Sequence, residues 1–114
     1  MAVRTELVVY ENNDEELDLV VTTLDDGAAY DLTGATLELV IKPTADTPDD
    51  DDGTVVLSSA DGDITITDPV TGTATVTVDR SHLAVPGTRA WRVDVVRPGS
   101  RRTAMYGPLH IINL

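Results

Sequence analysis

The sequence predicts an all-β protein, a single antiparallel β-sandwich of about seven to nine strands. Three observations lead to this prediction. Apolar and polar residues alternate along most of the chain, and turn residues separate the alternating runs about every 8–12 positions. Length is the third observation, because 114 residues are enough for one domain with its own core. We therefore expect residues 1–114 to form one domain, with an Ig-like or jelly-roll-like arrangement of two stacked sheets.

The clearest strand lies at residues 35–42, where every second residue from Ala35 to Ile41 is apolar. Successive side chains of a strand point to opposite faces, so this strand has one face for a core and one for solvent. The same alternation, often with threonine in the outward positions, predicts further strands. They are expected at residues 3–9, 17–21, 55–57, 64–66, 74–78, 91–95 and 105–112. Pro108 limits the last strand to a sheet edge or to an irregular start, since proline cannot donate to the ladder.

Turn residues fall between these strands, and each supplies a positive φ or a fixed φ. The predicted turns are Asp25-Asp26-Gly27, Thr33-Gly34, Asp61-Gly62, Pro69–Gly72, Pro86-Gly87 and Pro98-Gly99-Ser100. We expect residues 79–84 to form a single helical turn that crosses from one sheet to the other. Residues 43–53 contain four consecutive aspartates and no apolar anchor, which predicts a mobile loop.

The core must be built from Val, Leu, Ile and Ala, because the chain has no Phe and only one Trp. Trp91 is therefore expected to be the central packing residue. An outward Trp91 that stacks on a sugar is the alternative, but its register with Val93 and Val95 argues against that orientation. The predicted core residues are Leu37, Leu39, Ile41, Val76, Val78, Trp91, Val93 and Val95.

Charge is strongly negative and unevenly distributed. The net charge of −12 disfavours nucleic acid and anionic membrane surfaces as partners. Residues 1–79 carry 19 acidic and 2 basic side chains, whereas residues 80–114 carry six arginines and one aspartate. This asymmetry suggests a directional contact surface. The scarcity of lysine beside abundant Ala, Val, Thr and Asp is typical of a high-GC bacterial host or its phage.

Motifs for catalysis are missing from the sequence, so we expect no enzyme and no cofactor. The chain has no cysteine, its two histidines are His82 and His110, and no serine stands in a Gly-x-Ser-x-Gly context. Paired carboxylates stay open as an alternative, although a domain this small offers little room for a cleft that differentiates them. Residues Asp49–Asp52 are interpreted as a solvated charge run, with a weak calcium site as the alternative. The sequence contains no apolar run long enough to predict a targeting or membrane-spanning segment.

The arginines near the C-terminus are the predicted protein interface. Several of them flank the hairpin expected at Pro98-Gly99-Ser100, and arginine suits interfaces because its planar guanidinium is weakly hydrated and offers five donors. The alternative is pairing with the acidic part of the same chain. The interface candidates are Arg89, Arg92, Arg97, Arg101, Arg102, Met105 and Tyr106.

The order of the motifs resembles a known group of proteins. The resemblance is based on the segments Leu32-Thr33-Gly34-Ala35, Ile64–Asp68, Gly72–Val78, Pro86-Gly87 leading into Trp91–Val95, and a closing strand near Gly107. Together they are similar to the small β-sandwich domains of tailed-phage virion proteins, such as the N-terminal sandwich of baseplate upper proteins and the collar or tail-fibre-connector sandwiches. Each motif alone is only strand and turn chemistry, so the resemblance rests on order and spacing over nearly the whole chain.

The resemblance implies a non-enzymatic structural protein of the virion, located in the phage tail or neck region and made in the cytoplasm of the host. A minor tail, baseplate or tail-fibre-connector subunit is expected, with other virion proteins as partners in a symmetric multimer. A capsid or neck decoration protein and a host-surface glycan-binding module are the alternatives. Because the sequence stops at Leu114, without a fused fibre, we expect a connector or decoration role and not direct receptor binding.

Overall fold

The computed structural model describes residues 3–22, 28–44, 46–48 and 51–113. In these residues the chain forms nine strands and one short 3₁₀ helix. The strands are β1 (Val3–Arg4), β2 (Leu7–Tyr10), β3 (Glu15–Val20), β4 (Thr36–Lys42), β5 (Val55–Ser58), β6 (Ile64–Asp68), β7 (Thr73–Val78), β8 (Gly87–Arg97) and β9 (Ser100–Ile112), and the helix is η1 (Arg80–Leu83). No helix in the described ranges is long and apolar enough to cross a bilayer.

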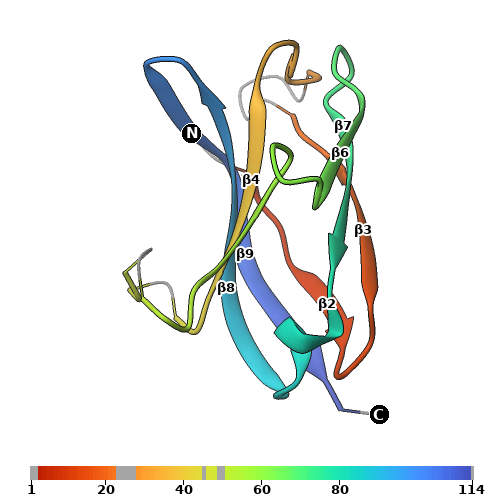
Figure 1. Cartoon of the computed structure of the whole chain (residues 1–114), viewed down its shortest axis with the longest axis vertical. Coiled ribbons are helices and arrows are strands. Elements are labelled where there is room, and N and C mark those ends of the chain that lie inside the picture. Colours follow the sequence, from red (N-terminus) through yellow and green to blue (C-terminus); the bar gives the residue numbers. More distant parts are fainter. Residues whose placement is uncertain (1–2, 23–27, 45, 49–50, 114) are drawn as a thin grey trace.

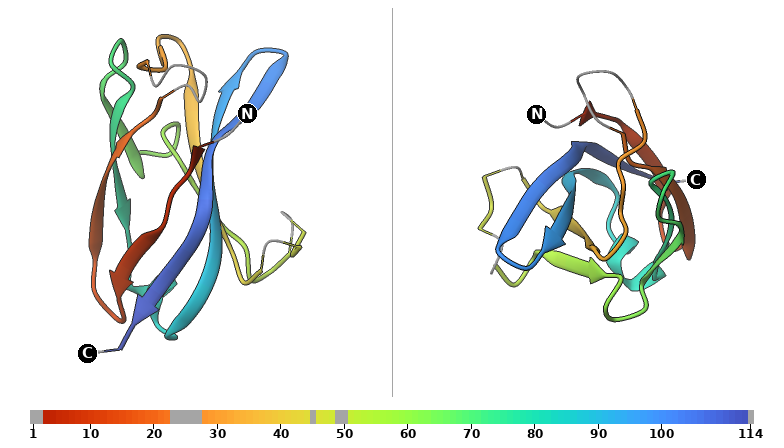
Figure 2. Two further views of the ribbon diagram at one scale, coloured as in Figure 1. Left: turned by 180° about the vertical axis from the view of Figure 1, so that it is seen from behind. Right: turned by 90° about the horizontal axis from the view of Figure 1, so that it is seen from above.

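The strands form two sheets that pack face to face (Figures 1 and 2). The larger sheet has the order β1-β9-β8-β4-β5, with β2 also paired to β9, and the smaller sheet has the order β3-β7-β6. The prediction of an all-β sandwich is confirmed. Each predicted strand range overlaps at least one observed strand, and residues 3–9 divide into β1 and β2.

The N-terminal strands differ from the predicted antiparallel arrangement. β1 and β2 run parallel to β9, whereas the other strand pairs are antiparallel. Leu7 pairs with Leu109 and Val9 pairs with Ile111. Because paired residues point to the same face of a sheet, this register buries Val9 beside Leu109 and Ile111 in the core. Short-range alternation says nothing about strand direction, which is why the sequence did not predict it.

Pro108 lies neither at a sheet edge nor at the start of the last strand, β9, so both predicted alternatives are wrong. β9 lies between β8 on one side and β1 with β2 on the other. A proline is tolerated inside this strand for a local reason. The pairing of the N-terminal segment with β9 stops after Arg4 and resumes at Leu7, so Pro108 lies opposite the interruption. Gly107 lies at the same place, and a Cβ on it would come within 1.8 Å of the Thr5 carbonyl oxygen. A side chain at this position would therefore break the join between β1 and β9.

The core lies between the sheets and has the predicted composition. All eight predicted core residues are buried. Trp91 is 3% exposed, and its indole Nε1 donates a hydrogen bond to the Pro108 carbonyl oxygen at 3.1 Å. The stacking-platform alternative for Trp91 is thereby excluded, since its ring does not face solvent.

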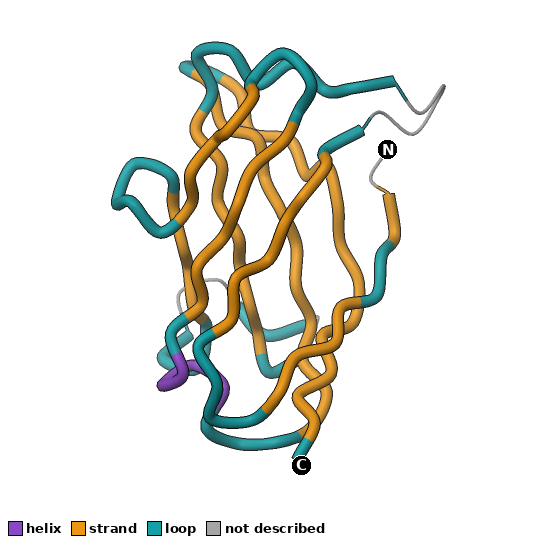
Figure 3. Tube along the Cα trace, turned by 90° about the vertical axis from the view of Figure 1, so that its right-hand side faces the viewer, coloured by secondary structure: helices purple, strands orange, loops and turns teal. Residues whose placement is uncertain are grey.

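The connections largely follow the predicted turns. η1 leaves β7 of the smaller sheet and leads into β8 of the larger one, at one end of the sandwich (Figure 3), which confirms the predicted helical turn. Arg97 pairs with Ser100, so the hairpin turns through Pro98 and Gly99. The predicted turn at residues 25–27 and two aspartates of the acidic run, Asp49 and Asp50, lie outside the described residues. The described residues of 43–53 contain no helix or strand.

Candidate functional site

The register of the larger sheet decides which side chains share its outer face. Val40 on β4 lies opposite Arg92 on β8, Arg92 lies opposite Tyr106 on β9, and Tyr106 lies opposite Arg4 on β1. These four residues form a row across the strands, because side chains at paired positions project to the same side. Two arginines from opposite ends of the sequence are thus aligned on one face.

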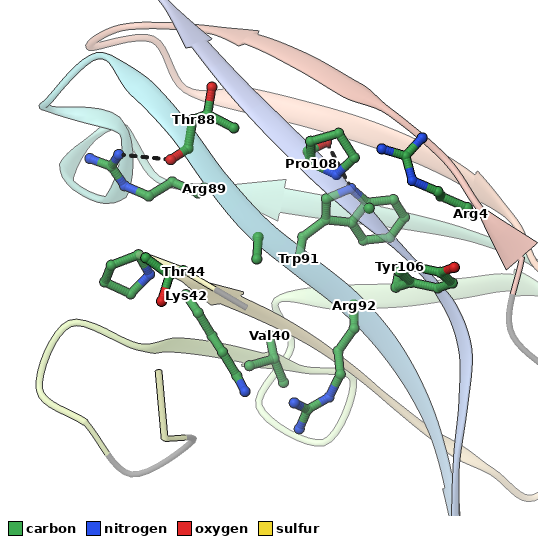
Figure 4. Close-up of a pocket in the computed structure, with 13 residues that line it drawn as sticks. Arg4, Val40, Lys42, Thr44, Thr88, Arg89, Trp91, Arg92, Tyr106 and Pro108 are labelled. Atoms are coloured by element: carbon green, nitrogen blue, oxygen red, sulfur yellow. Dashed lines mark hydrogen bonds between the residues drawn. The ribbon is translucent and has the colours of Figure 1, made fainter. Parts of the chain in front are cut away.

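A groove of about 440 Å³ is hollowed into this face (Figure 4). The row at Val40 and Arg92 forms one part of it. The row of Lys42, Ala90 and Pro108 forms the next, since these residues also pair across β4, β8 and β9. The full lining consists of Arg4, Val40, Lys42, Pro43, Thr44, Thr88, Arg89, Ala90, Trp91, Arg92, Tyr106, Gly107 and Pro108. We call it the basic groove.

The charged side chains that line the basic groove are all positive. Arg4, Lys42, Arg89 and Arg92 line it together with the phenol of Tyr106, and no Asp or Glu of the described residues belongs to the lining. These are four of the eight basic residues in a chain of net charge −12. Concave walls of one charge sign concentrate the local field, so the groove attracts anionic groups although the protein as a whole repels them.

The cationic side chains are held in different ways. The Arg89 guanidinium donates to the carbonyl oxygens of Thr88 and Val85, at 3.4 and 3.3 Å. The Arg92 Nε donates to the Asp94 carboxylate. Arg4 is exposed, and its guanidinium has no hydrogen bond or ion pair with another described residue. Backbone carbonyls leave the positive charge of Arg89 unneutralised, so both Arg4 and Arg89 can meet an external anion.

The floor of the basic groove is apolar. Val40 lies on the outer face but is only 2% exposed, and Ala90 and Pro108 lie beside it. Tyr106 is 44% exposed and supplies an aromatic wall. The site therefore combines cationic sides with an apolar base, a combination common at protein interfaces.

The next row of the same face, toward the hairpin, carries acids. Asp94 is 1% exposed, and its carboxylate accepts hydrogen bonds from Arg92 Nε, Arg101 and Thr103 Oγ1. Arg101 also donates to Glu38 on β4. The Glu38 hydrogen bond is the main cause that raises the pKa of Arg101, with a smaller contribution from Asp94 against the opposing effect of burial. We call these five residues the Asp94 cluster.

The seven predicted interface residues fall into different places. Arg89, Arg92 and Tyr106 line the basic groove. Arg101 belongs to the Asp94 cluster, and Arg97 donates to the Asp31 carbonyl oxygen. Arg97 and Arg101 therefore contact acidic residues of their own chain, which was the alternative to an interface role.

The two other candidates lie away from the groove. Arg102 is exposed on β9 and does not line it. Met105 is 7% exposed and packs in the core, so it offers little surface to a partner.

Two cations of the groove, Arg4 and Lys42, are not among the predicted interface residues. Lys42 had a signal, because the alternation of residues 35–42 places it on the outward face. Arg4 had none, since its position depends on the parallel pairing of β1 with β9.

An exposed apolar patch continues the outer face beyond the groove. Val8, Tyr10 and Ile112 are 54%, 41% and 39% exposed, and Tyr10 pairs with Ile112 across β2 and β9. Between this patch and Tyr106, His110 Nε2 lies 2.8 Å from Glu6 Oε1. Contiguous exposed apolar residues of this kind mark interaction surfaces more often than isolated ones do.

Ligand sets for a metal ion do not occur in the described part of the chain, where no group of three or more His, Asp or Glu side chains converges. The alternative of a weak calcium site at Asp49–Asp52 depends on residues outside the described ranges. The groups that the outer face does offer are cations, an aromatic wall and an apolar floor, and these are suited to binding.

The fold and this face define a β-sandwich domain with a basic groove on its larger sheet. Among solved structures, the fold is similar to the N-terminal domain of ORF48 of phage TP901-1, with a TM-score of 0.56 and 11% sequence identity. The match covers 96% of this chain and 84% of that one. No protein-family model matches the chain, and no curated protein matches its sequence.

Proposed function

We propose that the chain is a non-enzymatic structural protein of a tailed-phage virion, acting through contacts with other virion proteins. A minor tail, baseplate or tail-fibre-connector subunit is the specific role. The observation that carries the proposal is the likeness of nearly the whole chain to a domain of a phage protein, although identity is only 11%. The motif order in the sequence, which resembles tailed-phage β-sandwich domains, supports it independently.

The outer face of the larger sheet supports a role in assembly. It presents cations, an exposed tyrosine and an apolar patch together, and arginine and tyrosine are enriched at protein interfaces. In a symmetric particle each subunit repeats the same contact, so a weak individual contact is strengthened by multivalency.

The test is the composition of the phage particle that encodes this chain. We expect mass spectrometry of purified particles to detect the chain in a fixed ratio to other tail proteins, and deletion of its gene to yield particles with incomplete tails. Antibody labelling should place it at the tail or neck. Normal, infectious particles that lack the chain would contradict the proposal.

A further inference from the structure

We propose that the basic groove binds a short acidic peptide segment of a partner protein. The inference specifies what kind of partner the protein contacts in the virion. Its biological setting rests on the proposed function. The physical claim concerns only the groove and its four cationic residues, Arg4, Lys42, Arg89 and Arg92.

The arrangement of the cations points to several carboxylates and not to one compact anion. Arg4 comes from β1, Lys42 from β4, and Arg89 and Arg92 from β8, so the charges lie around the opening (Figure 4). An extended peptide places successive side chains on alternate sides at regular spacing, and its carboxylates can therefore meet separate cations. Arginine binds carboxylates well because its guanidinium offers two parallel donors.

The surroundings of the groove set a limit on ligand length. Glu38 and Asp94 lie in the next row of the same face, and the exposed Glu6 carboxylate lies on the other side, beside His110. The net charge of −12 repels any polyanion that extends past the cations. A segment of a few acidic residues gains the attraction of the groove without this repulsion, whereas a nucleic acid or an anionic membrane does not.

The apolar floor favours a peptide over a small inorganic anion. Val40, Ala90, Pro108 and the ring of Tyr106 have no charge to offer a phosphate ion, but they can contact aliphatic side chains that alternate with the acidic ones. The ligand that uses both the sides and the floor is an extended segment in which acidic and apolar residues alternate.

The experiment measures binding of a fluorescein-labelled hexapeptide of alternating Asp and Val to the purified chain, with the Asn-Val peptide as the uncharged control. We expect saturable binding of the acidic peptide only, weakened when salt rises from about 50 to about 500 mM. Trp91 lines the groove and is the only tryptophan of the chain, so its intrinsic fluorescence should change as the unlabelled peptide binds.

Two double variants with the same change of net charge separate the groove from general attraction. Arg4→Ser with Arg89→Ser should weaken peptide binding about tenfold or more, since charge-assisted hydrogen bonds are lost. Arg97→Ser with Arg102→Ser, outside the groove, should change it less than about twofold. Equal losses in both variants would overturn the proposal, because they would mean non-specific attraction.

Two further results would also overturn it. Displacement of the peptide by inorganic phosphate at equal concentration would show a general anion site. Concentration-dependent self-association that only the Arg4 and Arg89 variant abolishes would assign the groove to a second copy of the chain. None of these measurements uses the particle, so failure of peptide binding is distinguishable from absence of the chain in the virion.

Discussion

Two neighbouring regions of the larger sheet use arginine in opposite ways. In the Asp94 cluster, Arg101 bridges the carboxylates of Asp94 and Glu38, so its charge is neutralised within the chain. In the basic groove, the Arg89 guanidinium contacts only neutral carbonyl oxygens and Arg4 has no partner among the described residues. The two regions adjoin on the outer face, where the groove row of Val40, Arg92 and Tyr106 lies next to the row of Glu38, Asp94 and Thr103.

The difference shows that an arginine's role follows from the residue that the register places opposite or beside it. Arg92 belongs to both regions, because it lines the groove while its Nε contacts Asp94. Composition alone groups all these arginines together. The arrangement separates those that stabilise the fold from those that remain available to a partner.

The largest expected effect comes from the residue that lies beneath the groove and inside the core. Trp91→Ala should lower the free energy of unfolding by about 3–5 kcal/mol, as large-to-small changes in packed cores do. Both regions should be affected, since β8 carries residues of each. A thermal midpoint equal to that of the wild type would contradict the buried position of Trp91.

A smaller but still large effect is expected at the centre of the Asp94 cluster. Asp94→Asn should cost about 2–4 kcal/mol in urea unfolding, because a buried carboxylate is lost that accepts charged hydrogen bonds from Arg92 and Arg101. Glu38→Gln is the matched control and should cost less than about 1 kcal/mol, since its pair with Arg101 is partly exposed. Equal costs would mean that the burial of Asp94 does not matter.

Arg4 and Arg89, two groove cations outside the Asp94 cluster, should contribute little to stability. Arg4→Ser with Arg89→Ser is expected to change the free energy of unfolding by less than about 1 kcal/mol, because neither side chain pairs with a carboxylate. Urea unfolding of this variant beside Asp94→Asn makes the comparison directly. A cost as large as that of Asp94→Asn would place Arg4 and Arg89 in the stabilising group and remove the distinction between the regions.

The smallest effect concerns two exposed carboxylates, Asp14 and Asp79, and appears only in acid. A hydrogen bond from the Arg80 side chain holds the pKa of Asp14 below its ordinary value of 3.8, and one from Ser81 does the same for Asp79. A carboxyl whose pKa is lower in the folded state stabilises the protein above 3.8, and this contribution is lost as pH falls through the folded value.

Arg80→Ser removes the main cause of the Asp14 shift. The variant should therefore lose less stability than the wild type when urea unfolding is compared at neutral pH and at about pH 3. An identical acid response in both proteins would show that the exposed pair is fully screened by solvent.

The sequence predicted those features that depend on neighbouring residues. Alternation located the strands, and the missing Phe together with a single Trp identified Trp91 as the central core residue. Pro98 and Gly99 indicated the hairpin, because proline fixes φ and glycine accepts the positive φ of 76° that the turn requires. These signals come from neighbouring residues, so they can be interpreted without knowledge of the topology.

Features that depend on long-range pairing were missed. Nothing in the sequence indicates that β1 runs parallel to β9, and this pairing brings Arg4 into the groove. Met105 is different, because its alternation with Leu109 and Ile111 already indicated an inward position. Its residue type, common at interfaces, outweighed that signal in the sequence analysis.

The parallel pairing of β2 with β9 also sets the order in which the chain folds. The β8–β9 hairpin closes a two-residue loop, whereas β2 must find a strand about 100 residues away, at an additional loop-closure cost of about 3 kcal/mol. We therefore expect β2 to join last, and refolding to take milliseconds to seconds. Until β2 arrives, the edge of β9 that carries Leu109 and Ile111 is uncovered. This is the stage at which the folding chain is most exposed to pairing with a wrong strand.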